Sequence, residues 1–292
     1  MDYRIADFSL RTEGPHSDIA ACGLRGFKPF EVETDASAEP TMVLQMDSVI
    51  DEDKFAKTKV IHAFDFEQNY ASGELSRYAT GYRFEMTREG KTFLLVKEDG
   101  SNIVHSNLGK YDEADPSLVR FGIWIMFGII IAPLGAIAIH SSVIVKEHQA
   151  VMCLGESGTG KSTHTRLWRE NIEEARLLND DSPIIRMIDG KCIVYGSPWS
   201  GKTHCYVNKC VPVRGLLRLS QAPHNKIRRL PALLAIGAIL PSCPPAFAYD
   251  NTLQDYICNT VSDILASTPA YHLECLPNAA AAELSYTTIF NQ

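Results

Sequence analysis

The chain has 292 residues, of which 45% are hydrophobic and 22% charged, a composition typical of a globular protein with one large domain or two modest ones. Its net charge of −7 at pH 7 argues against a general affinity for nucleic acid, which needs a basic surface. The eight cysteines include no C-x-x-C pair, so the sequence indicates neither a zinc site nor a disulfide framework. With no signal peptide in the first residues, MDYRIADFSL, we expect reduced thiols and a cytoplasmic protein.

Residues 1–115 are predicted to form an antiparallel, β-rich N-terminal domain. In the stretch TGYRFEMTREGKTFLLVKEDGSNIVHS, strand-like runs alternate with the turn pairs Glu89-Gly90 and Asp99-Gly100. This pattern is typical of consecutive hairpins. We therefore place a domain boundary here, with a second domain over residues 116–292.

The segment 121–139 contains 19 residues without a charge, which is close to the length of a membrane span. Pro133 and Gly135 interrupt it, and Pro116 favours the first turn of a helix. We expect a buried helix that ends near Ile131, with a membrane span as the less favoured alternative.

A phosphate-binding motif follows two short apolar runs, SSVIV and AVMCL. The second run leads directly into GESGTGKS, which satisfies the pattern G-x-x-x-x-G-K-[ST], and a helix is predicted from Lys161 to about Asn171. In such a loop, glycines permit a tight turn whose backbone N–H groups bind phosphate oxygens. Lys161 would contact the β- and γ-phosphates of ATP, and the Ser162 hydroxyl would bind Mg²⁺. The predicted nucleotide-binding residues are Gly155, Glu156, Ser157, Gly158, Thr159, Gly160, Lys161, Ser162 and Thr163.

Two adjacent acids, Asp180 and Asp181, end the predicted strand 175–181. After a phosphate-binding loop, such acids can hold Mg²⁺ and accept the proton of an attacking hydroxyl. The alternative is a plain turn, because DDSP is also favourable turn chemistry. His140 precedes the loop, and taken alone it favours a structural role.

Three basic residues are weaker candidates for contacts with substrate. Lys202 lies in GSPWSGKTH, which is either a loop at the same edge as the phosphate-binding loop or a turn over Trp199. Arg228 lies in APHNKIRRL, which is either a mobile basic loop or a solvated face. The third is Arg214, in VPVRGLLRL. From about Leu230 the sequence predicts a mostly helical C-terminal part with one late strand, AYHLECL.

The order of these motifs resembles the HPr kinase/phosphorylase family, which shares a core with phosphoenolpyruvate carboxykinases. The resemblance covers about residues 116–230 and rests on IHSSVIV, LGESGTGKST, LLNDD and VPVRGLLRL. It implies an α/β fold with a P-loop kinase core, catalytic roles for Lys161, Asp180 and Asp181, and a place for His140 beside the acids. It also implies a possible homo-oligomer. The chain departs from the family at Pro212, where an acidic residue is usual, and in its N-terminal region.

The sequence therefore predicts a kinase that uses ATP and Mg²⁺ to phosphorylate a hydroxyl, with serine as the expected acceptor, in a peptide, a protein or a small metabolite. The alternatives are a nucleotide sensor without turnover and, less favoured, a carboxykinase acting on oxaloacetate. Neither a nucleic acid nor a membrane is expected as a partner.

Overall fold

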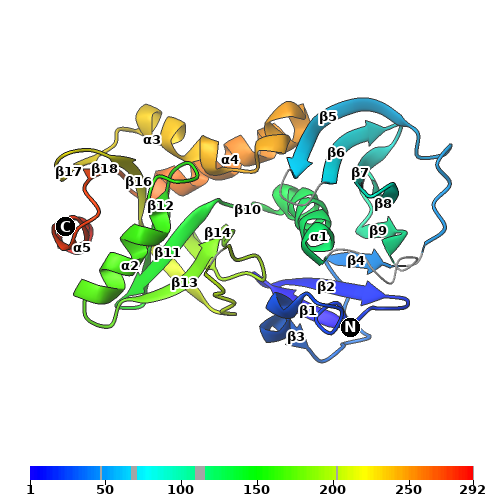
Figure 1. Cartoon of the computed structure of the whole chain (residues 1–292), viewed down its shortest axis with the longest axis horizontal. Helices are drawn as coiled ribbons and strands as arrows, with labels where there is room; N and C mark the ends of the chain where they lie inside the picture. The colour runs from blue at the N-terminus through cyan, green and yellow to red at the C-terminus, as the bar shows by residue number, and fades with distance from the viewer. Residues whose placement is uncertain (47, 67–70, 109–115, 202, 292) are drawn as a thin grey trace. The chain divides into compact units, whose positions relative to one another are not determined.

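The computed structural model describes the whole chain except residues 47, 67–70, 109–115, 202 and 292 (Figure 1). It is a mixed α/β structure whose contacts divide it into two compact units. Unit 1 comprises Met1–Leu134 with Ala246–Leu253, and unit 2 comprises Gly135–Pro245 with Gln254–Gln292. This division differs from the predicted boundary between residues 115 and 116, because the helix after that boundary makes its contacts within unit 1.

Within the residues described, unit 1 contains a nine-stranded sheet in the order β3-β1-β2-β4-β9-β8-β7-β6-β5. The turn between β7 and β8 contains Glu89 and Gly90, both with positive φ, as a tight hairpin turn requires. The sequence predicted an antiparallel sheet, but β4 runs parallel to both β2 and β9, so the sheet is mixed. The strands are β1 (Asp2–Ile5), β2 (Phe8–Glu13), β3 (Glu31–Val32), β4 (Met42–Gln45), β5 (Lys57–Phe66), β6 (Ala71–Tyr78), β7 (Gly81–Arg88), β8 (Lys91–Glu98) and β9 (Ile103–Ser106).

Helix α1 (Pro116–Ile131) ends at the residue that the sequence predicts. A Cβ atom on Gly122 would lie 3.0 Å from the side chains of Leu95 and Met86, so the helix packs closely on β7 and β8 at this point. By length and composition the segment Pro116–Leu134 is apolar enough to cross a membrane, and 67% of its 18-residue apolar window is buried inside the structure. In this structure α1 is therefore largely a core helix.

Unit 2 contains a second sheet, in the order β10-β14-β15-β16-β12-β11-β13, with β18 beside β16 and β17 beside β18 among the described residues. The pairs β12–β16 and β16–β18 are parallel. The strands are β10 (Ala136–Ala138), β11 (Ser141–Lys146), β12 (Gln149–Leu154), β13 (Arg176–Asp181), β14 (Ile184–Ile188), β15 (Lys191–Tyr195), β16 (Cys210–Gln221), β17 (Lys226–Arg229) and β18 (Ala270–Cys275). The helices are α2 (Lys161–Asn171), α3 (Ala232–Ile239), α4 (Asn251–Ser267), whose residues up to Leu253 belong to unit 1, and α5 (Ala279–Phe290).

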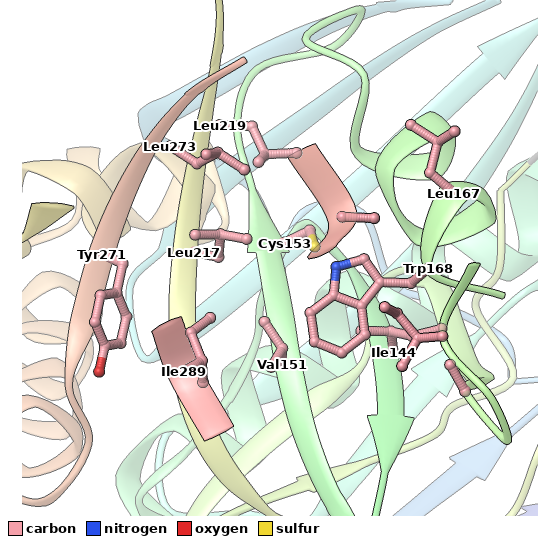
Figure 2. Packing of buried hydrophobic residues seen from close by; sticks show 13 residues of the cluster. Ile144, Val151, Cys153, Leu167, Trp168, Leu217, Leu219, Tyr271, Leu273 and Ile289 are labelled. Atoms are coloured by element: carbon pink, nitrogen blue, oxygen red, sulfur yellow. The ribbon is translucent and has the colours of Figure 1, made fainter. Parts of the chain in front are cut away.

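The core of unit 2 lies between the sheet and the helices α2 and α5 (Figure 2). Alternate residues of β12, β16 and β18 point to this face, among them Val151, Leu217 and Leu273. They pack with the fully buried Trp168 of α2 and with Ile289 of α5. This packing fixes the end of β12 against the start of α2, which is where the phosphate-binding motif lies.

Candidate functional site

The motif forms a loop between β12 and α2, the glycine loop (Gly155–Gly160). Gly158 and Gly160 have φ values of +83° and +101°, which residues with a side chain rarely adopt, and a Cβ atom on Gly155 would collide with Thr159. Helix α2 begins immediately afterwards, at Lys161. The loop therefore directs the unpaired N–H groups of a helix N-terminus toward the end of the sheet.

Lys161 folds back over the glycine loop. Its Nζ atom donates to the carbonyl oxygens of Gly155, at 2.7 Å, and Glu156, at 3.0 Å. Burial lowers the pKa of Lys161, while the charges of Asp181 and Asp180 act in the opposite direction. Carbonyl oxygens thus hold the ammonium group at the loop. When a phosphate group is bound, its oxygens can take the place of these carbonyl oxygens as acceptors for Lys161.

The two acids lie on opposite faces of the sheet. Asp180 pairs with Ser142 across β11 and β13, and Asp181 pairs with Ser141. Asp180 shares the face of α2, where its Oδ1 atom accepts a hydrogen bond from the Ser162 hydroxyl at 2.9 Å. A hydroxyl and a carboxylate, the two protein oxygens expected of a magnesium site, are therefore already in contact.

Asp181 lies beside His140 on the other face, with 3.7 Å between His140 Nε2 and Asp181 Oδ1. Burial lowers the pKa of His140, and the positive charge of Lys161 lowers it further, while Asp181 and Asp180 raise it. The net direction is downward, which favours the neutral imidazole. The structure brings His140, Lys161, Asp180 and Asp181 together at one end of the sheet.

A second loop, GSPWSGKTH, lies next to the acids and is held there by Asn179 of β13, a residue for which the sequence predicted no role. The Asn179 amide donates to the carbonyl oxygens of Ser197 and Trp199, each at 3.3 Å. The N–H of Gly201 donates to the Asp180 carbonyl oxygen at 2.7 Å. The GSPWSGKTH loop therefore lies against the acids, and its Trp199 is buried, so both interpretations agree with the structure. Lys202 itself is outside the described residues.

The structure places Arg214 and Pro212 away from the glycine loop. In the parallel pairing of β12 with β16, Leu154 lies opposite Arg218, and Ala150 opposite Val213. Arg214 is therefore near the other end of the strand, where its Nε atom donates to the Ile289 carbonyl oxygen at the end of α5. This contact is typical of an arginine that caps a helix C-terminus, and the position of Arg214 gives no support to a contact with a substrate at the glycine loop. Pro212 pairs with Ile193 of β15, so an acid at that position would not reach the glycine loop.

Arg228 belongs to strand β17, on which Lys226, Arg228 and Arg229 are exposed, so the segment is not a loop throughout and agrees with the solvated-face interpretation. The other motif residues are in or next to the glycine loop. Glu156 forms an ion pair with Arg218, Thr159 donates to the Glu156 carbonyl oxygen, and Ser157 is exposed. Neither Arg218 nor His272 was selected from the sequence, because only strand pairing brings them to this site.

A cavity of about 530 Å³ adjoins the glycine loop. Its walls combine loop backbone with apolar side chains, and the buried His164 of α2 forms part of them. The ring of His164 lies 3.0 Å from the Ser285 hydroxyl of α5, measured from Nε2 to Oγ. The lining residues are Gly158, Thr159, Gly160, Thr163, His164, Leu167, Gln221, Ala222, Cys275, Leu276 and Pro277.

Comparison with known proteins identifies no matching family model and no matching curated protein. Among solved structures, the Hpr(Ser) kinase/phosphatase from Coxiella burnetii is similar to part of the chain. The sequences are 14% identical, the match covers 52% of this chain and 87% of the other, and the TM-score is 0.32. The similarity is distant, and no function is assigned from it.

Proposed function

We propose that unit 2 is a kinase that uses ATP and Mg²⁺ to phosphorylate a hydroxyl group of a peptide, a protein or a small metabolite. The observation that carries this proposal is the contact between Ser162 and Asp180, 2.9 Å long, at the start of α2 and next to Lys161. In phosphoryl transfer the protein contributes mainly by positioning and by neutralising charge. A helix N-terminus, a lysine, and a hydroxyl–carboxylate pair are the groups that such a reaction needs.

The phosphate groups of ATP would lie in the glycine loop. There the N–H groups of the loop and of the first turn of α2 donate hydrogen bonds, and Lys161 supplies a positive charge. The neighbouring cavity of about 530 Å³ has room for a nucleoside. We assign the base and ribose to this cavity.

The Ser162 hydroxyl and the Asp180 carboxylate would hold the magnesium ion. Both are hard oxygen donors, and Mg²⁺ in kinase sites usually takes one or two protein ligands and completes its shell with phosphate oxygens and water. The described residues include no group of three or more His, Cys, Asp or Glu side chains arranged around a common ion. When bound, the ion would neutralise charge on the transferred phosphoryl group.

Asp181 would accept the proton of the attacking hydroxyl. It lies on the face opposite Asp180, so the two carboxylates can serve different partners. The neutral His140 can orient Asp181 without cancelling its negative charge.

The test is acceptor-dependent release of ADP by the full chain, with Mg²⁺, free serine and a panel of serine-containing peptides. Asp181→Asn should lower kcat by roughly 10²- to 10⁴-fold while ATP still binds. Asp180→Asn should raise the Mg²⁺ concentration required, and Asp189→Asn, in the turn between β14 and β15, is the matched control. Equal turnover by all three variants would contradict the assigned roles, and ATP binding without turnover on any acceptor would favour a nucleotide sensor.

A further inference from the structure

One row of paired residues crosses the sheet of unit 2 beside the glycine loop. Strand pairing puts its members directly opposite one another, from β13 across to β17. Directly paired residues project to the same face of a sheet, and here that face is opposite the core packed by α2 and α5. In order, the row is Asp181, Ser141, Leu154, Arg218, His272 and Arg228.

The glycine loop leaves the sheet from Leu154, in the middle of this row. Asp181 therefore lies on one side of the loop, and the basic half of the row, Arg218, His272 and Arg228, lies on the other. Neighbouring strands are about 4.8 Å apart, so the backbone of Arg228 is roughly 14 Å from that of Leu154. Arg218 contacts the glycine loop through Glu156, and strand pairing continues the row from Arg218 to His272 and Arg228.

Arg218 retains hydrogen-bonding capacity at this position. Its Nη2 atom is 3.4 Å from Glu156 Oε1, a long contact with a mostly exposed carboxylate. Its Nη1 atom is buried and has no hydrogen-bond partner in the described part of the chain. A buried guanidinium nitrogen without a partner is costly in a folded protein, and an oxyanion would satisfy it.

His272 lies between the two arginines. Its Nε2 atom is 2.9 Å from the Ser220 hydroxyl, and burial lowers its pKa, with Arg228 and Arg218 acting in the same direction and Glu274 in the opposite one. Glu274 belongs to the next row, where it pairs with Lys226. The basic half of the row therefore contains no carboxylate of its own, although Glu156 faces Arg218 and Glu274 acts on His272 from outside it. The two arginines keep a positive potential along this part of the row, which favours an anion.

We propose that Arg218, His272 and Arg228 bind an anionic group, a phosphate or a carboxylate, that belongs to the acceptor. The acceptor is then a hydroxyl compound or peptide that is itself negatively charged. The assignment of this anion to an acceptor rests on the proposed kinase function. The binding of the anion to the row does not, and it can be measured separately.

The test is calorimetric titration of the full chain with inorganic phosphate and, separately, with succinate, while the glycine loop is saturated with Mg²⁺ and a non-hydrolysable ATP analogue. At least one of the two anions should bind with nucleotide present, and the more tightly bound one indicates the acceptor's group. Arg218→Gln and Arg228→Gln should each weaken binding by roughly 10-fold or more, as loss of a charge-assisted hydrogen bond implies. Arg229→Gln is the matched control, because this neighbour on β17 pairs with Tyr271 and projects to the other face. Thermal melting confirms that each variant is folded.

The proposal is overturned if neither anion binds while the analogue is bound, since the row then serves the nucleotide's own phosphates or no ligand. It is also overturned if Arg229→Gln weakens binding as much as Arg228→Gln does. Repeating the titration without nucleotide on Lys161→Ala separates the two proposals. Anion binding that survives there and disappears with Arg228→Gln supports the row even if the chain proves to have no kinase activity.

Discussion

The buried His164 should make unit 2 sensitive to mild acid. Its ring lies between α2 and α5, next to Ser285 of α5. Trp168 Nε1 donates to the Ser285 hydroxyl at 2.8 Å and lies 3.3 Å from His164 Nε2. The Trp168 N–H is a donor only, so it offers nothing to a protonated imidazole. Burial lowers the pKa of His164 from 6.5 to about 4.

Proton linkage gives the direction in which the free energy of unfolding changes with pH. Between pH 6.5 and 4 the unfolded chain binds a proton at this histidine and the folded chain does not, so acid favours unfolding. A shift of one pKa unit corresponds to 1.36 kcal/mol, so lowering the pH from 7.5 to 5 should remove about 2 kcal/mol of the free energy of unfolding through this group alone. The loss should approach about 3 kcal/mol below pH 4.

The assay is urea unfolding of the parent and His164→Gln at pH 7.5 and at pH 5. Glutamine keeps a polar group beside Ser285 but does not titrate, so the variant's stability should change by about 2 kcal/mol less than the parent's over this range. His148→Gln, in the exposed turn between β11 and β12, is the matched control. If His164→Gln shows the same pH dependence as the parent, the histidine is not held neutral by burial.

Three further predictions follow from the same contacts. Trp168→Ala should lower the free energy of unfolding by about 3–5 kcal/mol in urea titrations, because the fully buried indole leaves a cavity between α2, α5 and the sheet. Gly155→Ala should weaken ATP binding, measured by calorimetry, because the added methyl group collides with Thr159 and changes the glycine loop; an unchanged affinity would show that the loop adapts. Ser162→Ala should raise the Mg²⁺ concentration needed for ATP binding by roughly 10-fold or more, since it removes one of the two proposed metal ligands. A magnesium titration checks this, and an unchanged requirement would remove Ser162 from the site.

The sequence predicted the features that depend on local signals. Helix α2 begins at Lys161 because the glycines before it permit the required turn, and α1 ends near Pro133 because proline and glycine interrupt its apolar run. The same local chemistry predicted the hairpin of β7 and β8 around Glu89-Gly90.

The remaining features depend on contacts between distant segments. Adjacent residues of a strand alternate between faces, but only the structure shows that Asp180 faces α2 and that Asp181 faces His140. The pairing of β12 with β16 shifts between Ala150 and Val151, and this irregularity lies beside Arg214, whose contact with the end of α5 no local sequence signal indicates. Long-range packing likewise assigns α1 to unit 1, which a boundary drawn from composition cannot show.

The most direct test of the proposed function is the binding of ATP to the full chain, measured by calorimetry with and without Mg²⁺. Lys161→Ala is compared with Lys191→Ala, which removes the same charge from an exposed position on β15. We predict Mg²⁺-dependent binding of ATP that Lys191→Ala leaves unchanged and Lys161→Ala weakens by roughly 100-fold, a loss of about 3 kcal/mol. Equal affinities of the two variants for ATP, or an affinity that does not depend on Mg²⁺, would contradict the proposed site.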